Sequence, residues 1–172
     1  MKVLIATDGT LDPIAAAEAA ARLAGEEGEI TVLTVVEIPR RLLTDLRAVY
    51  GEATGTPPID ESIETAGHTT PRPHLSFDWP GDDAILNRYI DDQRQARTDT
   101  VVTALADRGV SVDAVAHDSE DPVSEILRVA KEGRYDVICI GTHGQGRFEG
   151  LLGSTSTKII RRAPGAVLTI RS

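Results

Sequence analysis

The sequence has little of several residues on which whole classes of protein depend. Its single cysteine, Cys139, excludes an internal disulfide, and its place in the apolar run DVICIG predicts a small core residue rather than a nucleophile. One tryptophan, three tyrosines and two phenylalanines are too few for stacking on nucleobases, so the core must be built from Val, Ile, Leu and Ala. No stretch approaches the roughly 20 apolar residues that a membrane-spanning helix requires.

The chain is short and acidic. Its 172 residues fit one domain, since most domains contain roughly 100 to 200 residues. The formal net charge of -9 opposes nonspecific contact with nucleic acid and with anionic membranes. The first residues, MKVLIATDG, show no secretory signal, and together with the lone cysteine they predict a cytoplasmic protein.

Short apolar runs alternate with helical patterns along most of the chain. The runs predict five strands, at residues 2–7, 29–38, 110–118, 137–141 and 166–171. Start and stop signals predict helices from Pro13 to a glycine, over 82–107, from Pro122 to Gly133, and over 154–163. In the second helix, near-helical spacing indicates a buried stripe of Ile85, Leu86, Tyr89, Ala96, Thr100, Val101, Ala104 and Leu105.

The alternation of buried strands with helices predicts an α/β fold. We expect a single domain over residues 1–172, with an open parallel five-stranded sheet and helices on both faces. Residues 40–81 interrupt the pattern with prolines, glycines and little periodicity, which predicts a long proline-rich insertion. Ligands of such sheets bind beyond the carboxyl ends of the strands. The segments 7–9, 35–37 and 141–144 should meet at that edge.

The stretch GTHGQGRFEGLLGSTSTK, residues 141–158, has the composition of a phosphate-binding loop. Its glycines allow close approach to backbone N–H groups, and Ser154 and Thr155 open the helix that follows, whose dipole favours an anion. The stretch contains neither G-x-x-x-x-G-K-[ST] nor G-x-G-x-x-G. A plain flexible turn would need fewer glycines, so we favour a phosphate or nucleotide site.

Together with KVLIATDGT and TVLTVVE near the start, this stretch resembles the universal stress protein family. Nucleotide-binding members carry G-x2-G-x9-G-[ST], and here Gly141, Gly144, Gly153 and Ser154 match the fixed positions. The resemblance implies an adenine-nucleotide alpha hydrolase-like, Rossmann-like fold. Only eight residues separate Gly144 from Gly153, one fewer than in the family pattern, and the 40–81 insertion is longer than usual.

The resemblance also implies a set of binding residues at the sheet edge. Asp8 matches an acidic residue that contacts base or ribose, and the backbone of Val35 matches a position that faces the base. Gly144, Gly153, Ser154 and Thr155 would hold ribose and phosphates. The complete set is Ala6, Thr7, Asp8, Val35, Ile140, Gly141, Gly144, Gly153, Ser154 and Thr155.

Simpler interpretations compete at several positions. Asp8-Gly9 is also an ordinary turn pair, and the acidic run DSED at 118–121 precedes a helix start, where it favours the dipole without a ligand. The run DDQRQARTD, residues 91–99, is typical of a solvated helix face. The histidines and Cys139 lack ligand spacing, so no metal site is expected, and no catalytic residues are assigned.

Three functions remain open. The first is a stress-response regulator that binds ATP or AMP, with Mg²⁺ accompanying ATP, and acts as a homodimer through the C-terminal strand, residues 166–171. The second is a dimerisation and interaction module of the same fold that does not bind nucleotide, which the shortened loop favours. The third is an enzyme on a related scaffold, which the absence of HIGH-like and SGGxDS-like motifs disfavours; at most, slow ATP hydrolysis is expected.

Overall fold

A computed structural model describes residues 1–42, 44–45, 82–142 and 152–171 of the chain. The chain divides into two compact units, one of residues Met1–Ile38 with Leu86–Ser172 and one of residues Pro39–Ile85. Most of the predicted 40–81 insertion lies outside the described residues. The first unit contains the sheet and is the subject of the rest of the text.

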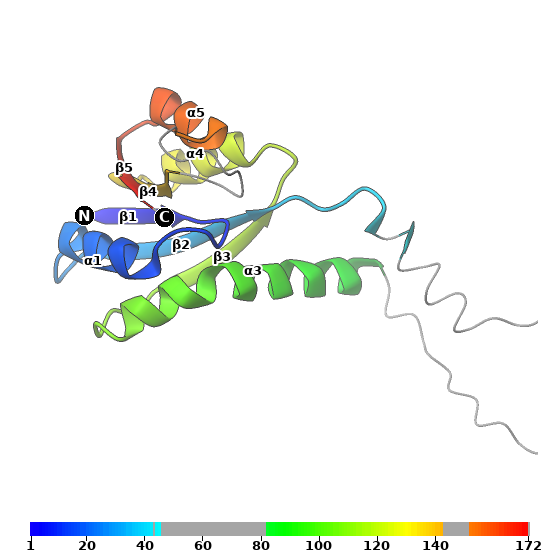
Figure 1. Cartoon of the computed structure of the whole chain (residues 1–172), viewed down its shortest axis with the longest axis horizontal. Coiled ribbons are helices and arrows are strands. Elements are labelled where there is room, and N and C mark those ends of the chain that lie inside the picture. Colours follow the sequence, from blue (N-terminus) through cyan, green and yellow to red (C-terminus); the bar gives the residue numbers. More distant parts are fainter. Residues whose placement is uncertain (43, 46–81, 143–151, 172) are drawn as a thin grey trace, which may run out of the picture. The chain divides into compact units, whose positions relative to one another are not determined.

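In the described part of the first unit, five strands alternate with four helices, the last of the helices to be numbered being α5 (Figure 1). The elements are β1 (Lys2–Ala6), α1 (Pro13–Ala24), β2 (Glu29–Val36), α3 (Asp82–Ala106), β3 (Asp113–Asp118), α4 (Pro122–Glu132), β4 (Val137–Gly141), α5 (Ser154–Arg162) and β5 (Ala166–Ile170). All strand pairs are parallel, in the order β3-β2-β1-β4-β5. The predicted five-stranded parallel α/β fold is confirmed.

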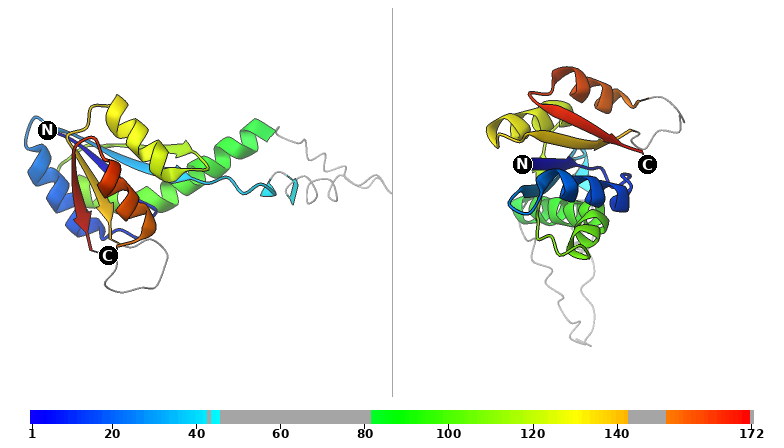
Figure 2. Two further views of the ribbon diagram at one scale, coloured as in Figure 1. Left: turned by 90° about the horizontal axis from the view of Figure 1, so that it is seen from above. Right: turned by 90° about the vertical axis from the view of Figure 1, so that its left-hand side faces the viewer.

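The sheet is covered on both faces, which explains why its inner strands are continuous apolar runs. Helices α1 and α3 cover one face, and α4 and α5 cover the other (Figure 2). Successive residues of β1 alternate between the two cores: Val3 and Ile5 pack toward α1 and α3, whereas Leu4 and Ala6 pack toward α4. The structure therefore has two apolar cores, one on each side of the sheet.

Helix α1 begins and ends where its sequence predicts. The side chain of Asp12 accepts from two backbone N–H groups of the first turn, and Pro13 occupies the first helical position. Gly25 follows the last turn with a φ of 70°, a conformation that favours glycine. The helix buries only alanines, at Ala16, Ala17, Ala20 and Ala24, so that it lies close against the sheet.

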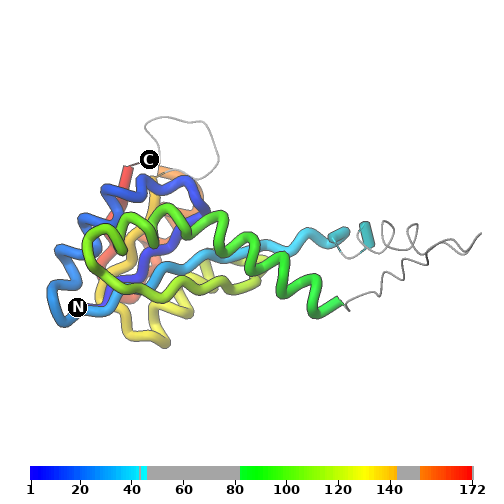
Figure 3. Tube along the Cα trace, turned by 90° about the horizontal axis from the view of Figure 1, so that it is seen from below, coloured from blue at the N-terminus to red at the C-terminus, as the bar shows by residue number. Residues whose placement is uncertain are grey.

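Helix α3 runs beside α1 on the same face (Figure 3), but its buried residues differ in part from the predicted stripe. Ala96 and Thr100 are exposed, while Thr98 is buried at 2% exposure and its hydroxyl donates to the carbonyl of Arg94. All fully buried positions lie in the C-terminal half, because only that part packs on the sheet: Thr98, Val101, Ala104 and Leu105. Small residues such as alanine indicate the buried face poorly.

Within the described part of the chain, no helix is both long and apolar enough to cross a membrane.

Candidate functional site

The strand order creates a topological switch point between β1 and β4. After β1 the chain passes to α1 on one face of the sheet, and after β4 it passes to α5 on the other. In open parallel sheets, ligands bind beyond the carboxyl ends of the strands at such a point. Here the register pairs Ala6 with Ile140, both of them buried, so the predicted residues that follow them converge at one edge.

The turn after β1 is organised by its own side chains. The hydroxyl oxygen of Thr7 accepts from the N–H of Gly9 at 3.0 Å, and Gly9 has a φ of 92°. Oδ1 of Asp8 accepts from both the backbone N–H and the hydroxyl of Thr10, at 3.1 and 2.6 Å. Asp8 therefore forms a local turn, as its simpler interpretation predicts. Its carboxylate is exposed, and both of its contacts with Thr10 use Oδ1.

The start of α5 is tied directly to the end of β4. The N–H of Gly153 donates to the carbonyl of Thr142 at 2.9 Å, and the hydroxyl of Ser156 donates to the carbonyl of Gly141 at 2.7 Å. Ser154 lies in the first turn of α5 and is exposed. These two bonds fix the amino end of α5 beside the switch point.

Three helices begin at this edge, and their first turns differ in one respect. Oδ1 of Asp12 caps α1 with two bonds of 3.0 Å, and Oδ1 of Asp121 caps α4 by accepting from Ser124 at 3.2 Å. Gly153, at the cap position of α5, makes no side-chain hydrogen bond to the helix. Among the described residues, therefore, no side chain is seen to cap the N–H groups at the start of α5, whereas carboxylates cap the first turns of the other two helices.

One residue at the edge was not predicted. Nη1 of Arg97, in α3, donates to the backbone carbonyl of Val35 at 3.0 Å. Residues 91–99 were expected to be a solvated face, and this is wrong for Arg97, which is half-buried, and for Thr98. The contact spans 62 positions of sequence, so no local pattern could have revealed it. The side chain of Val35 itself packs into the core on the α4 face.

The predicted site residues thus fall into three groups. Some are buried strand ends that shape the edge: Ala6, Thr7, Val35 and Ile140. Others present backbone or polar groups there: Asp8, Gly141, Gly153, Ser154 and Thr155. Gly144 lies outside the described residues.

The structure describes the surroundings of Cys139 and, within its described ranges, those of side chains that bind metals. Burial raises the pKa of the Cys139 thiol to about 11, which keeps it protonated and agrees with its predicted place in the core. No group of three or more His, Cys, Asp or Glu side chains in the described ranges is placed to hold a metal ion.

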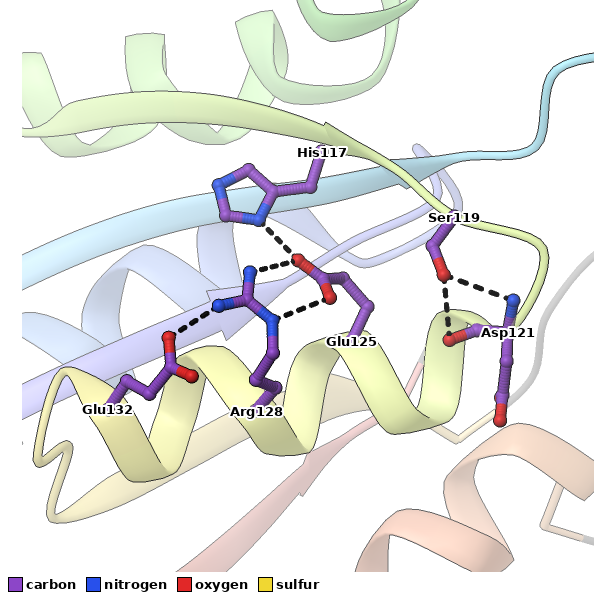
Figure 4. Close-up of polar contacts among 6 residues, drawn as sticks. All are labelled: His117, Ser119, Asp121, Glu125, Arg128 and Glu132. Atoms are coloured by element: carbon purple, nitrogen blue, oxygen red, sulfur yellow. Dashed lines mark hydrogen bonds and ion pairs between the residues drawn. The ribbon is translucent and has the colours of Figure 1, made fainter.

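A polar network joins the end of β3 to α4 (Figure 4). Nδ1 of His117 lies 2.6 Å from Oε1 of Glu125, and Arg128 donates to both oxygens of the same carboxylate at 2.6 and 2.9 Å. Arg128 also contacts Glu132. Arg128, and to a lesser extent His117, lower the pKa of Glu125 to about 2. Since β2 separates β3 from the switch point, we assign this network a structural role.

Asp121, at the start of the same helix, confirms the simpler interpretation of the DSED run. Hydrogen bonds from the hydroxyl and N–H of Ser124 lower the pKa of Asp121, and they occupy its two carboxylate oxygens. Its own N–H donates to the hydroxyl oxygen of Ser119 at 3.1 Å. Asp121 of the acidic run therefore stabilises the start of α4.

Several solved structures have a similar fold. A universal stress protein from Archaeoglobus fulgidus matches with a TM-score of 0.57 and 16% identity, over 99% of this chain and 98% of that chain. A universal stress protein in complex with cAMP matches with a TM-score of 0.54 and 16% identity, over 99% and 96%. A family member from Arabidopsis thaliana with AMP bound matches with a TM-score of 0.50 and 15% identity, over 99% and 91%.

At these identities the likeness to solved structures concerns the fold. No curated protein sequence matches the chain. The model of the universal stress protein family, by contrast, matches residues 1–171, which include every element of the sheet and both sides of its switch point. The chain therefore belongs to the universal stress protein family.

Proposed function

We propose that the protein is a cytoplasmic stress-response regulator that binds ATP or AMP at the carboxyl edge of its sheet. One observation carries the proposal: α5 begins beside the β1–β4 switch point without a side-chain cap, whereas Asp12 and Asp121 cap α1 and α4. A phosphate is the natural partner of such a helix start. Structures of similar fold have been solved with cAMP and AMP, which supports the same ligand class.

The spacing of the strands suits a mononucleotide. Neighbouring strands lie about 4.8 Å apart, so the ends of β4 and β2 are separated by roughly 10 Å across β1. A phosphate at Ser154 and Thr155 would place the ribose near Asp8 and the base near Val35. The exposed carboxylate of Asp8 suits a ribose hydroxyl as hydrogen-bond donor.

ATP would bring Mg²⁺ with it. Because the described residues offer no cluster of three ligands, the phosphates would supply most of the coordination. The role we propose is regulation rather than catalysis, with slow ATP hydrolysis at most.

Calorimetry with three related ligands tests the site. We expect AMP to bind at least tenfold more tightly than adenosine, because only AMP places a phosphate at the start of α5. ATP with Mg²⁺ should also bind. Protein purified without added nucleotide should release an adenine nucleotide that mass spectrometry identifies. If none of the three ligands binds, the proposal is wrong and the alternative of an interaction module without nucleotide replaces it.

We also propose a homodimer through the edge strand β5. The N–H of Thr142 donates to Ile170 at 2.8 Å, and the N–H of Ala166 donates to Asp136 at 3.1 Å. Backbone groups alternate in direction along a strand, so those of Ala166, Leu168 and Ile170 face β4. The groups of the two residues between them face outward, where a second copy can pair with them.

Proline substitutions in β5 test separately the backbone groups that face outward and those that face β4. Val167→Pro removes an outward N–H and leaves the bonds to β4 in place, so we expect a monomer by light scattering, with a loss of stability limited to the packing of the Val167 side chain against the core on the α4 face. Leu168→Pro removes an N–H that faces β4 and should instead lower the melting temperature. A Val167→Pro protein that remains a dimer would discard this interface.

A further inference from the structure

The turn after β1 leaves one backbone acceptor at the end of β2 without its partner from β1. The N–H of Thr7 donates to the carbonyl of Leu33 at 2.9 Å. In a regular parallel pair, the N–H of Gly9 would next donate to the carbonyl of Val35, because such bonds recur at every second residue. Gly9 instead turns away with a φ of 92°, and its N–H donates to the hydroxyl oxygen of Thr7. The ladder of bonds between β1 and β2 therefore stops before Val35.

Arg97 of α3 supplies the missing donor. Its Nη1 donates to the carbonyl of Val35 at 3.0 Å. Its stem lies against the turn, because a Cβ added to Gly9 would lie 3.4 Å from the Cα of Arg97 and 3.6 Å from its Cβ and Cγ. A charged donor makes a stronger hydrogen bond than a neutral one, so the guanidinium holds this carbonyl at least as firmly as an N–H of β1 would.

The end of β2 is thus held on both sides. On the side of β3, the carbonyl of Val36 accepts from the N–H of Ser119 at 3.1 Å. On the side of β1, Arg97 is the donor that holds the carbonyl of Val35. Loss of the guanidinium would free this carbonyl to move. A ligand would then have to order it on binding, and ordering the backbone of one residue is enough to weaken an affinity about tenfold.

We propose that Arg97 is a positioning residue of the nucleotide site, which holds the carbonyl of Val35 in place for the base. This inference rests on the proposed nucleotide site, in which the base lies near Val35. A carbonyl oxygen has two lone pairs, so Val35 can accept from Arg97 and from a donor of the base, such as the 6-amino group of adenine, at the same time. Arg97 acts through Val35 and keeps the acceptor ordered before the ligand arrives.

AMP and ribose 5-phosphate are a matched pair of probes, because both have ribose and phosphate and only AMP has a base. In Arg97→Met, which keeps a long stem beside Gly9 but has no donor, we expect the dissociation constant of AMP to rise about tenfold in calorimetry. The dissociation constant of ribose 5-phosphate, measured by NMR titration because its binding is weaker, should stay the same. Arg97→Lys, which keeps a charged donor, should recover part of the AMP affinity.

Arg94→Met is the matched control, since it removes from the same helix a guanidinium that pairs with Asp91, and it should leave both dissociation constants unchanged. If Arg97→Met does not fold, as judged by circular dichroism, Arg97→Gln, whose side chain is shorter and uncharged, gives the same comparison.

The outcomes separate this inference from the nucleotide site itself. A role in stability alone would lower the free energy of unfolding of Arg97→Met in urea without changing the ratio of the two dissociation constants. That result overturns the inference and leaves the nucleotide site standing, and so does an equal weakening of both probes. Failure of the wild-type protein to bind AMP overturns the inference, and failure to bind ATP as well overturns the nucleotide site.

Discussion

Replacing Gly153 with aspartate should stabilise the protein and weaken its binding of phosphate at the same time. Gly153 is the cap residue of α5, with a φ of -58° and a ψ of 159°, a conformation that any residue adopts. An aspartate there would cap α5 as Asp12 caps α1, through bonds of 3.0 Å to two N–H groups of the first turn. The carboxylate would then occupy the place that we assign to phosphate.

The gain in stability combines three small effects. Aspartate is a better cap than glycine by a few tenths of a kcal/mol. A negative charge at a helix start adds about 0.3–1 kcal/mol, and loss of glycine's freedom in the unfolded chain adds about 0.4–1 kcal/mol. We expect a rise of about 1 kcal/mol in the free energy of unfolding, or roughly 2–4 °C in melting temperature for a domain of this size.

The loss of binding follows from charge. A carboxylate and a phosphate about 4 Å apart repel by about 4 kcal/mol at an effective dielectric constant of about 20. Even a third of that repulsion weakens AMP binding about tenfold. Gly153→Asn is the matched control, because it can cap α5 without a charge and should keep most of the AMP affinity.

Thermal unfolding by circular dichroism, without and with AMP, measures both effects. Without AMP, Gly153→Asp should unfold at a higher temperature than wild type. Addition of AMP should raise the melting temperature of Gly153→Asp less than that of wild type. Two results would refute the reasoning. An aspartate variant that binds AMP as well as wild type would show that phosphate does not bind at the start of α5. An aspartate variant without any gain in stability would show that this helix start is already satisfied.

Two further predictions concern stability away from the site. Glu125→Gln should lower the free energy of unfolding by about 1 kcal/mol at pH 7, because Glu125 accepts from Arg128 and lies 2.6 Å from His117. The pKa of Glu125 in the folded protein, about 2, lies below its ordinary value of 4.5. The difference in free energy of unfolding between Glu125→Gln and wild type should therefore persist above pH 4.5 and disappear as the pH falls toward 2. Urea unfolding at a series of pH values checks this, and a difference in free energy that does not depend on pH would contradict it. Thr34→Val should raise the free energy of unfolding by about 1 kcal/mol, because the fully buried Thr34 hydroxyl has no hydrogen-bond partner among the described residues. A less stable Thr34→Val protein in urea would show that the hydroxyl has a partner.

The fold could be predicted because it depends on patterns that are local in sequence. A strand buried on both faces is a short apolar run, as in β1 and β4, and the helix starts carry their own signals in Asp12-Pro13 and Asp121-Pro122. Because strands and helices alternate along the chain, few topologies other than a parallel sheet are possible. The phase of α3 could not be predicted as well, because the helix is largely polar and only its C-terminal half is buried.

The residues of the candidate site also divide into those that a local sequence pattern predicts and those that it does not. Asp8, Gly153 and Ser154 could be found because they follow strands or open a helix and so carry a motif. Arg97 could not, because its contact with Val35 depends on how α3 lies across the sheet, after a segment of more than forty residues that says nothing about that position. The run that contains it also carries exposed carboxylates at Asp91, Asp92 and Asp99, and such a run is typical of a solvated helix face.

Because two hydrogen bonds join the start of α5 to the end of β4, the position of α5 does not depend on the length of the segment between them. Since Gly153 is held by Thr142 and Ser156 by Gly141, α5 starts at the same place whatever number of residues lies between. Adding or removing one residue changes mainly the entropy of closing the loop, which varies by only about 0.6 kcal/mol for a doubling of length. The eight-residue spacing between Gly144 and Gly153 is therefore compatible with the phosphate site that we propose at the start of α5. A change of length in this segment is therefore expected to leave the start of the helix in place.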